Sequence, residues 1–555
     1  MKTAHTDTFI IDGLPTAEQL PQFEFDVPEL IFPEHANCVV ELLDRAIREK
    51  GFANNVLLRS EHVSLTYAQV ADRVDRIAQL LIEDYSLVPG NRVLLRGGNS
   101  VGLALAWLAV VKAGLVAVAT MPLLRAKELG EIIAKAKPSL AICAATLRDE
   151  LDSAIAATAF TAATAATAAT APNAQGIPVI VFGEFDNRDE LSVLAAKKSG
   201  AFSACDTVAT DPAMLAFTSG TTGKPKAAVQ THRDLLAACE TWPRHVLRAL
   251  PSDVVIGSPP LAFTFGLGGL LIFPMWAGAS VFFPSNPYSP EYAVQTIRDV
   301  GATVCYTAPT FYRQMAPFAA SAPMPSLRIC VSAGEGLPDA TRQLWKETTG
   351  IEMLDGIGAT EMFHIFISSA GADVRRGAIG KVVPGYRAKI VDDDGNEVPR
   401  GTIGKLAVIG PTGCKYFDEP RQARYVKDGW NFPGDAFLQD VDGYFFYQAR
   451  ADDMIITSGY NVGGPEVEDA LLKHAAVAEC GVIGEPDVDR GMIVKAFVVL
   501  RPGHSGDMAM VKALQDHVKA MLAPYKYPRA IEFRATLPRT ETGKLQRFKL
   551  REMKV

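Results

Sequence analysis

Short runs of β-branched and apolar residues alternate with helical patterns over most of this chain, and no other feature restricts its fold as strongly. Between Leu42 and about Leu500 these runs include Arg92–Leu95, Leu115–Val118, Ser139–Ile142, Val179–Val181, Val254–Ile256 and Ala302–Cys305. Helices that connect successive strands cover both faces of a sheet, and the strands then run parallel. The sequence therefore predicts an α/β fold of layered, largely parallel sheets.

The length and a change of pattern near residue 450 predict two domains. A chain of 555 residues is too long for one hydrophobic core. The apolar strand Tyr444–Tyr447 is followed by the polar stretch 448–453, where we expect the strand to break. We predict a large N-terminal domain of layered α/β subdomains over 1–449, a hinge at 450–453 and a small, mobile α+β domain over 454–555.

One stretch carries the chemistry of anion binding. It consists of Thr218, Ser219, Gly220, Thr221, Thr222, Gly223, Lys224, Pro225 and Lys226. Its glycines permit close backbone approach to an anion, its hydroxyls donate hydrogen bonds and its lysines supply positive charge. The apolar run Ala213–Phe217 predicts a buried strand leading into it. Only two residues separate the glycines and a proline follows Lys224, so the spacing is not that of a Walker loop.

Composition and charge exclude several classes of function. The net charge is −7, which implies no general attraction to nucleic acid or to an anionic membrane. The eight cysteines form no CxxC pair, which argues against a zinc site or a disulfide framework and for a reducing cytoplasm. The N-terminal residues contain no apolar signal core.

Two stretches of unusual composition need an interpretation. Segment 254–290 contains no charged residue, but prolines and glycines interrupt it. We expect it to form a buried strand, loop and helix that cross the core, not a membrane span. Segment 154–172 is almost entirely alanine and threonine. It predicts a surface helix or a mobile linker without a catalytic role.

The 218–226 string, which alone is also compatible with a surface turn, closely resembles the signature loop of the adenylate-forming superfamily. This superfamily comprises acyl- and aryl-CoA synthetases, peptide-synthetase adenylation domains and luciferases. Further motifs follow in the superfamily's order over roughly residues 40–550. The resemblance implies that ATP is bound by Thr218, Ser219, Gly220, Thr221, Thr222, Gly223, Lys224 and Lys226, with the loop holding the β- and γ-phosphates.

The segment Asp355–Glu361 resembles the second nucleotide motif of the superfamily. The resemblance implies that Asp355, Gly356, Ile357 and Gly358 lie along the adenine, with Gly358 also facing the acid. Thr360 is expected to contact the α-phosphate and Glu361 to hold Mg²⁺, a hard cation suited to carboxylate and phosphate oxygens. The superfamily usually has tyrosine at the position of Ile357, so ring stacking is lost there. A turn at a helix start is the alternative interpretation of this segment.

Three further motifs complete the nucleotide site that the resemblance implies. Ser332–Gly336 places Gly334 and Glu335 on the other side of the adenine. Asp435, which follows Pro-Gly, is expected to accept hydrogen bonds from the ribose hydroxyls, and Arg450 to contact ribose and phosphate. Lys544 matches the lysine of the adenylation half-reaction, since a point charge on a flexible stem reaches both the attacking carboxylate and the α-phosphate.

The resemblance also implies a second half-reaction. Ser458, Gly459 and Tyr460 match the loop that lines the pantetheine tunnel of coenzyme A, and Asp452 matches the hinge position. After adenylation the C-terminal domain is expected to rotate about Asp452, remove Lys544 and present the Gly459 loop. The implied enzyme is an AMP-forming acid–thiol ligase that uses ATP, Mg²⁺ and coenzyme A.

The acid substrate is indicated by aromatic residues. Phe263 and Phe265 occupy the acyl-pocket segment, where many relatives have histidine at the first of these positions, and they favour a flat ring. Both residues are equally compatible with plain core packing. Met362–Ile365 and Thr412–Cys414 resemble the benzoate-CoA ligase subgroup, particularly its 2-aminobenzoate-CoA ligases. His364 is expected to polarise the carboxylate or to bond a ring substituent, or else to be a satisfied buried histidine.

Several functions remain open at this point. The first is a ligase for a benzoate-type acid, with 2-aminobenzoate preferred over benzoate or 2-hydroxybenzoate. The second is a free-standing adenylation protein that loads a carrier protein. The third, a non-catalytic nucleotide-binding module, conflicts with the joint presence of Glu361, Asp435, Arg450 and Lys544. The expected partners are small molecules only, without nucleic acid or membrane, and the protein is expected to be a monomer or homodimer.

Overall fold

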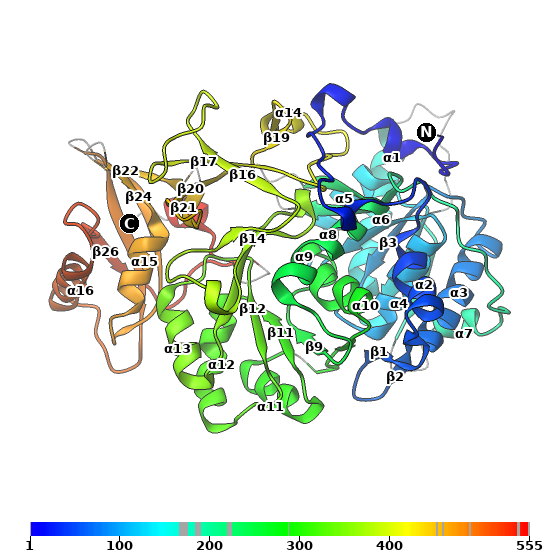
Figure 1. Cartoon of the computed structure of the whole chain (residues 1–555), viewed down its shortest axis with the longest axis horizontal. Helices are drawn as coiled ribbons and strands as arrows, with labels where there is room; N and C mark the ends of the chain where they lie inside the picture. Colours follow the sequence, from blue (N-terminus) through cyan, green and yellow to red (C-terminus); the bar gives the residue numbers. More distant parts are fainter. Residues whose placement is uncertain are drawn as a thin grey trace.

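The computed structural model describes residues 2–165, 176–183, 190–218, 225–286, 288–450, 453–457, 460–487, 490–540 and 544–552. A large N-terminal region carries the blue to yellow segments of Figure 1, and a smaller C-terminal region, orange and red, lies at one end of it. The N-terminal region contains three sheets, whereas the C-terminal region contains a single sheet. The predicted α/β fold, with a large and a small domain, is confirmed.

The first sheet has six strands, of which only the last pair is antiparallel. In spatial order they are β6 (Val179–Phe182), β5 (Leu140–Ala144), β3 (Arg92–Arg96), β4 (Val116–Thr120), β7 (Pro212–Thr218) and β8 (Lys226–Thr231). Both faces are buried, since Val93 and Leu95 pack into one core cluster and Leu94 into another. This two-sided burial explains why the strands are continuous apolar runs.

Helices cover this sheet on both sides (Figure 1). They are α3 (Tyr67–Glu83), α4 (Val101–Lys112), α5 (Ala126–Ala136), α6 (Arg148–Ala165) and α7 (Glu190–Ala195). Helix α3 begins at a capping box in which Thr66 and Gln69 exchange hydrogen bonds. The predicted helix in the alanine- and threonine-rich segment is α6 as far as Ala165, and the remainder of that prediction, 166–172, lies outside the described residues.

The second sheet has nine strands, parallel in its centre and antiparallel at both ends. Their order is β15 (Lys381–Val382), β14 (Ile365–Ser368), β13 (Met353–Gly358), β12 (Ile329–Ser332), β11 (Val304–Thr307), β9 (Val254–Gly257), β10 (Ser280–Phe282), β1 (Val56–Arg59) and β2 (Ser64–Thr66). One face packs against α11 (Pro290–Val300), α12 (Pro309–Ser321) and α13 (Asp339–Thr349). The other face joins the core cluster that also contains the buried side of α4.

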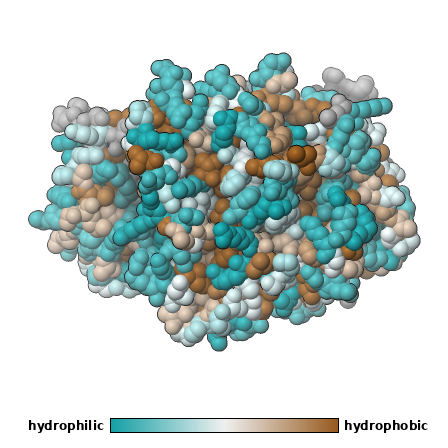
Figure 2. Space-filling view, in the orientation of Figure 1, coloured by the Kyte–Doolittle hydropathy of each residue, from teal (hydrophilic) through white to brown (hydrophobic). Residues whose placement is uncertain are grey.

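The uncharged segment 254–290 lies inside this second layer, as predicted. It forms β9, α9 (Thr264–Leu267), a π-helical turn over Gly268–Ile272, α10 (Phe273–Ala277) and β10. Among the described residues, no helix is both long and apolar enough to cross a membrane. Figure 2 shows hydrophilic residues spread over the whole visible face, with hydrophobic ones between them.

The third sheet departs from the predicted parallel arrangement, because all of its pairs are antiparallel. Its strands are β16 (Arg387–Val391), β17 (Ile403–Ile409), β18 (Val426–Lys427), β19 (Trp430–Asn431), β20 (Asp435–Gln439) and β21 (Phe445–Arg450). Tight turns at Gly395, Gly429 and Gly443, all with positive φ, join the strands of this region. Such turns return the chain directly, whereas a parallel pair needs a crossover.

The predicted break after Tyr447 is wrong. Strand β21 continues to Arg450, because Ala449 and Arg450 pair with Ala436 and Asp435 of β20. The strand therefore ends at Arg450, which lies in the candidate site. The predicted hinge residue Asp452 lies outside the described residues.

The C-terminal region is a five-stranded mixed sheet with helices, as predicted for an α+β domain. Its elements are β22 (Ile455–Thr457), β23 (Tyr460–Val462), α15 (Gly464–Leu472), β24 (Val477–Asp487), β25 (Gly491–Leu500), α16 (Met508–Met521), β26 (Ala530–Phe533) and α17 (Arg547–Glu552). Helices α15 and α16 pack on one face of the sheet, whereas Leu550 of α17 packs with Ile483 and Phe497.

Short elements complete the N-terminal region. They are α1 (Phe9–Asp12), α2 (Arg45–Glu49), α8 (His232–Glu240) and α14 (Gln422–Tyr425). The segment before α2 runs along the surface and forms hydrogen bonds with distant parts of the chain. The Ala4 amide donates to Asp211 at 3.1 Å, and Phe23 forms a β-bridge with Gly410.

Candidate active site

The ends of the predicted phosphate loop are joined as the ends of a hairpin. Thr218, the last residue of β7, pairs with Lys226, the first residue of β8. Residues 219–224, the loop itself, lie outside the described residues. The Lys226 ammonium donates a hydrogen bond to the Tyr416 hydroxyl at 3.0 Å and lies 5.0 Å from the centre of its ring. The lysine that closes the loop is thus held by an aromatic residue far away in the sequence.

A strained turn follows β13 and carries the predicted residues Glu361 and His364. The 3₁₀ turn Thr360–Met362 is followed by Phe363 with φ 69° and ψ −54°, and the His364 amide donates to the Met362 carbonyl at 2.9 Å. This geometry is a γ-turn of the rare, strained kind. The motif 355–361 therefore ends in this turn and not at a helix start.

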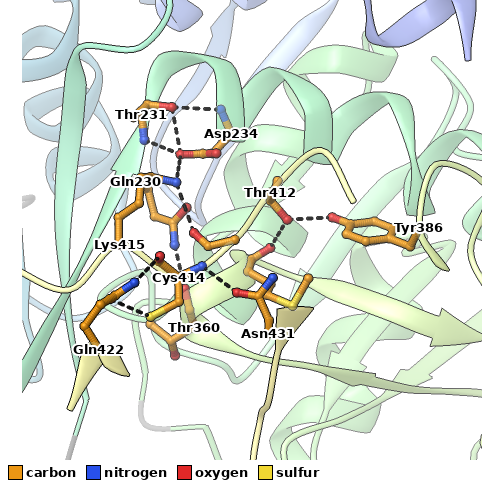
Figure 3. A network of polar contacts seen from close by, with 12 residues as sticks. Gln230, Thr231, Asp234, Thr360, Tyr386, Thr412, Cys414, Lys415, Gln422 and Asn431 are labelled. Atoms are coloured by element: carbon orange, nitrogen blue, oxygen red, sulfur yellow. Dashed lines mark hydrogen bonds and ion pairs between the residues drawn. The ribbon is translucent and has the colours of Figure 1, made fainter. Parts of the chain in front are cut away.

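Three side chains from neighbouring elements hold the turn in place. Gln230 Nε2 donates to the Thr360 carbonyl at 2.7 Å, and Thr412 Oγ1 donates to the Met362 carbonyl at 2.8 Å. The Tyr386 hydroxyl in turn lies 2.8 Å from Thr412 Oγ1 (Figure 3). Because strained backbone persists only where its surroundings fix it, these bonds explain how the turn is maintained.

Glu361 is the candidate metal ligand at this turn. Only 8% of it is exposed, and its carboxylate accepts a hydrogen bond from the Tyr416 hydroxyl. Burial, with the nearby Glu361 charge, raises the pKa of Tyr416, so this hydroxyl stays protonated. Among the described residues no three His, Cys, Asp or Glu side chains form a metal cluster. One carboxylate suits Mg²⁺, which takes one or two protein carboxylates and otherwise water and substrate phosphates.

Asp435 and Arg450, the predicted ribose contacts, face each other on paired strands. Both carboxylate oxygens of Asp435 lie 3.1 Å from Arg450 Nη1, which also donates to the Pro433 carbonyl at 2.9 Å. Burial raises the pKa of Asp435, and the Arg450 charge opposes this effect. Gly434 has φ +85°, and a Cβ there would lie 2.8 Å from Arg450 Nη2, so the turn needs glycine.

The adenine segment shows a buried acid and a crowded glycine. Asp355 accepts a hydrogen bond from the Gly356 amide at 2.9 Å, and burial raises its pKa to about 7. The guanidinium of Arg342 lies 3.8 Å from its other oxygen and opposes this effect. A Cβ on Gly358 would lie 2.4 Å from the His364 carbonyl oxygen, so no side chain fits there. Ile357 pairs with Ile367 of β14.

Lys544 of the C-terminal region lies at these nucleotide residues. Its Cε is 3.5 Å from the position of a Cβ on Gly334, which has φ +90°. Lys544 keeps contact with solvent, but the protein atoms around its ammonium lower its pKa by desolvation. Glu335, Asp435 and Glu361 act on the same ammonium in the opposite sense. The structure thus brings the predicted lysine to the predicted carboxylates.

Contacts between the two regions of the chain accompany this placement. Glu335 accepts a hydrogen bond from Thr310 at 2.7 Å and lies 3.5 Å from the guanidinium of Arg539. Lys473 of the C-terminal region lies 3.5 Å from Asp339 at the start of α13. Tyr460, 54% exposed, stacks instead on Tyr525 with ring centres 4.4 Å apart. Ser458 and Gly459 lie outside the described residues. The C-terminal region therefore faces the predicted nucleotide residues with the side that carries Lys544.

The acid end of the site is an aromatic box around His364. The imidazole centre lies 4.6 Å from Phe273, 5.3 Å from Trp242 and 5.5 Å from Phe265. Only 5% of His364 is exposed, and neither ring nitrogen has a hydrogen-bond partner in the described stretches of the chain. Burial lowers the pKa of His364 to about 3, against a weaker raising effect of the Phe265 backbone beside the ring, so the ring is neutral. This histidine is buried but not satisfied.

The predicted pocket residues and the observed ones overlap only partly. Phe265 contacts His364, whereas Phe263, half-buried, precedes α9 and its amide donates to the Pro260 carbonyl at 3.0 Å. The sequence did not single out Trp242, which lies in a stretch of mixed polar and apolar residues, or Phe273, which lies in the uncharged segment 254–290. Neither pattern signals a contact with His364. Tyr416 was also missed. Its signal was its position two residues after Cys414, the end of the segment Thr412–Cys414 that the subgroup resemblance marks.

Comparison with known families identifies the class of this chain. Residues 44–416 match the AMP-binding enzyme family, and residues 466–544 match the AMP-binding enzyme C-terminal domain. The chain belongs to the family of AMP-binding enzymes. The predicted adenylate-forming fold and the class of acid–thiol ligase are thereby confirmed.

Individual relatives narrow the comparison. The chain is 35% identical over 529 residues to a benzoate–CoA ligase of Thauera aromatica, covering 94% of this chain and 97% of that protein. The crystal structure of the anthranilate CoA ligase AuaEII with anthranoyl-AMP is 33% identical, with a TM-score of 0.86 over 95% of this chain and 98% of that one. A benzoate CoA ligase from Burkholderia xenovorans LB400 is 30% identical, with a TM-score of 0.81 over 93% and 100%. The predicted benzoate-CoA ligase subgroup is confirmed.

Proposed function

We propose that this protein ligates a benzoate-type acid to coenzyme A through an aryl-adenylate, releasing AMP and pyrophosphate, and that its acid is 2-aminobenzoate. The observation that carries the proposal is the neutral, unpartnered His364 inside an aromatic box, directly after the turn that holds Glu361. The similarity to a ligase crystallised with anthranoyl-AMP supports it, since anthranilate is 2-aminobenzoate.

The nucleotide would be held by groups around the Glu361 end of the strained turn. The 218–226 loop takes the β- and γ-phosphates, and the Asp355–Gly358 strand and Gly334–Glu335 flank the adenine. Asp435 and Arg450, already paired at 3.1 Å, take the ribose. Glu361 would hold Mg²⁺, which screens the phosphate charges when bound. Thr360 donates to the α-phosphate.

Adenylation requires two anions to meet. The acid carboxylate and the α-phosphate repel each other, and Lys544 offsets this repulsion as the carboxylate oxygen attacks phosphorus and pyrophosphate leaves. The Lys544 charge sits among Glu335, Asp435 and Glu361 before the nucleotide arrives. These carboxylates attract the ammonium toward the site, which reduces the reorganisation needed at the reacting atoms.

The thioester half-reaction would use the other face of the C-terminal region. Rotation about Asp452, in the hinge 450–453 between domains 1–449 and 454–555, withdraws Lys544. The Ser458–Tyr460 loop then guides the coenzyme A thiol to the acyl carbon, and AMP leaves as the carbon–oxygen bond to phosphate breaks.

All eight cysteines are free, which supports a reducing cytoplasm.

The preference for a 2-amino group follows from hydrogen bonding. A neutral imidazole has one acceptor nitrogen and one donor N–H, so His364 can accept a hydrogen bond from an ortho-amino group and donate one elsewhere. An unsubstituted benzoate would leave both nitrogens of this buried ring without a partner, which is unfavourable. A 2-hydroxyl group also offers a donor, so 2-hydroxybenzoate is the second candidate.

A panel of acids tests the proposal. The protein is incubated with ATP, Mg²⁺ and coenzyme A, and with benzoate or its 2-amino, 2-hydroxy or 2-fluoro derivative, and the thioester is quantified by mass spectrometry. We expect the highest kcat/KM for 2-aminobenzoate. A preference for benzoate would overturn the assignment of the acid. Adenylate without any thioester would favour carrier-protein loading, and no product from any benzoate would refute the aryl-CoA ligase.

A further inference from the structure

We infer that Tyr416 is a positioning residue for adenylation, whose hydroxyl orients the Glu361 carboxylate by tying it to the phosphate-loop lysine Lys226. The hydroxyl donates to the Glu361 carboxylate and accepts from the Lys226 ammonium at 3.0 Å. Three residues, one from each of three separate segments, therefore meet at one oxygen atom. The inference rests on the proposed function only in that Glu361 is taken to hold Mg²⁺.

The Tyr416 hydroxyl can serve both charged groups at the same time. A carboxylate only accepts hydrogen bonds and an ammonium only donates them, whereas a hydroxyl does both. A direct ion pair between Glu361 and Lys226 would also satisfy the two charges, but it would use the carboxylate as a partner of the lysine. With Tyr416 between them, the lysine is fixed without direct contact to the carboxylate.

The position of Tyr416 is fixed by its backbone and its ring. The Val229 amide donates to the Lys415 carbonyl at 2.7 Å, and the Phe417 amide donates to the Ala227 carbonyl at 2.9 Å. These bonds join the Tyr416 segment to β8, which begins with Lys226. Only 1% of Tyr416 is exposed, and its ring packs edge-on against Tyr425 at 5.8 Å between ring centres. The hydroxyl therefore holds the Glu361 carboxylate at a fixed position relative to β8.

Loss of this hydroxyl would leave the Glu361 carboxylate without the donor that orients it. Partners that orient a metal ligand typically change metal affinity or activity by about 10- to 100-fold when removed. We expect the effect to be confined to the adenylation half-reaction, because the attack of the thiol on a formed adenylate uses neither Glu361 nor Lys226. A merely structural role would reduce both half-reactions, so an effect on adenylation alone distinguishes a positioning role from it.

The test compares Tyr416→Phe with Tyr425→Phe. The Tyr425 hydroxyl is buried but has no hydrogen-bond partner among the described residues, so its removal is a matched control for the loss of one phenol oxygen. ATP binding is measured by calorimetry over a range of Mg²⁺ concentrations, without acid or coenzyme A. We expect Tyr416→Phe to need about 10-fold more Mg²⁺ for half-maximal effect, and Tyr425→Phe to match the wild type. Equal Mg²⁺ dependence in all three proteins would overturn the inference.

A second measurement keeps the result interpretable if Tyr416→Phe is less stable. Thioester formation from synthetic aryl-adenylate and coenzyme A is compared with acid-dependent ATP–pyrophosphate exchange. We expect exchange to fall about 10-fold and thioester formation to stay within about twofold of the wild type. Equal loss of both would show a structural role and contradict the inference. If the wild type activates no benzoate, the proposed function fails, whereas the Mg²⁺ dependence of ATP binding still tests Tyr416.

Discussion

The two ends of the strained turn Thr360–His364 differ in how the protein satisfies their polar groups. At the nucleotide end, Glu361 is bonded to Tyr416, and Asp435 is paired with Arg450. At the acid end, His364 is enclosed by aromatic rings and both of its nitrogens lack a partner in the stretches that the structure describes. The turn thus joins charged groups that other side chains of the protein already bind to a histidine that has no hydrogen-bond partner among the described residues.

Because of this difference, we expect the nucleotide end to determine catalysis and the acid end to determine selectivity among acids. Charged groups that are already oriented by the protein stabilise charge on phosphorus whatever the acid is. A buried polar group without a partner is costly, and an acid that supplies the missing hydrogen bond removes that cost. We therefore expect changes at the nucleotide end to affect all acids alike, and changes at the acid end to affect the choice among acids.

The largest expected effect is at the nucleotide end. Lys544→Ala removes the cation that offsets the repulsion between carboxylate and α-phosphate, so acid-dependent ATP–pyrophosphate exchange should fall by about 10²- to 10³-fold. The loss should be the same for every benzoate in the panel. Thioester formation from synthetic aryl-adenylate serves as the control and should be largely intact. Equal loss in both half-reactions would refute the role of this lysine.

A smaller, selective effect is expected at the acid end. His364→Leu removes the hydrogen bond to the ortho-amino group, so kcat/KM for 2-aminobenzoate should fall about 10-fold while KM for ATP is unchanged. The ligand-free protein should become more stable by about 1–3 kcal/mol, because two unpartnered buried nitrogens are removed. Steady-state kinetics and urea unfolding measure the two effects. If His364→Leu were less stable than the wild type and its kcat/KM fell equally for all acids, the difference proposed between the two ends would be contradicted.

A third prediction concerns the pH dependence of stability. Burial lowers the pKa of His364 to about 3, below the ordinary value of 6.5 that applies in the unfolded chain. Its contribution to stability is complete above pH 6.5 and is lost as the pH falls toward 3, because only the unfolded chain takes up the proton. The slope is about 1.4 kcal/mol per pH unit for each such histidine.

The stability difference between wild type and His364→Leu isolates this contribution from other titrating groups. His232, whose pKa burial also lowers to about 3, and Asp355, whose pKa it raises to about 7, remain in both proteins. Urea unfolding at pH 7, 6 and 5 should show the gap widening as the pH falls. A constant gap would mean that His364 takes up its proton at the ordinary pKa in the folded protein as well.

The residues assigned to the nucleotide end could be picked out from the sequence, because they lie in local motifs. Asp435, Arg450 and Lys544 each lie in a short segment of recognisable pattern, and the structure brings all three together. The strands of the two parallel layers were also predictable, since burial on both faces makes them continuous apolar runs.

The acid end and the supports of the turn were not predictable from local pattern. Trp242 and Phe273 meet His364 only through the tertiary fold, and an apolar residue in a core segment carries no signal of such a contact. Tyr416 lies 55 positions from Glu361 in the sequence, and Gln230 lies 130 positions from Thr360. The γ-turn at Phe363 could not be foreseen either, because a bulky residue rarely adopts a positive φ.

ATP–pyrophosphate exchange without coenzyme A tests the central claim most directly, namely that this chain activates an aromatic acid as its adenylate. The protein is mixed with ATP, Mg²⁺, labelled pyrophosphate and 2-aminobenzoate, and the label in ATP is followed over time. The account predicts exchange that requires the acid and Mg²⁺ but not coenzyme A. Absence of exchange with every benzoate, or formation of ADP and phosphate instead, would contradict it.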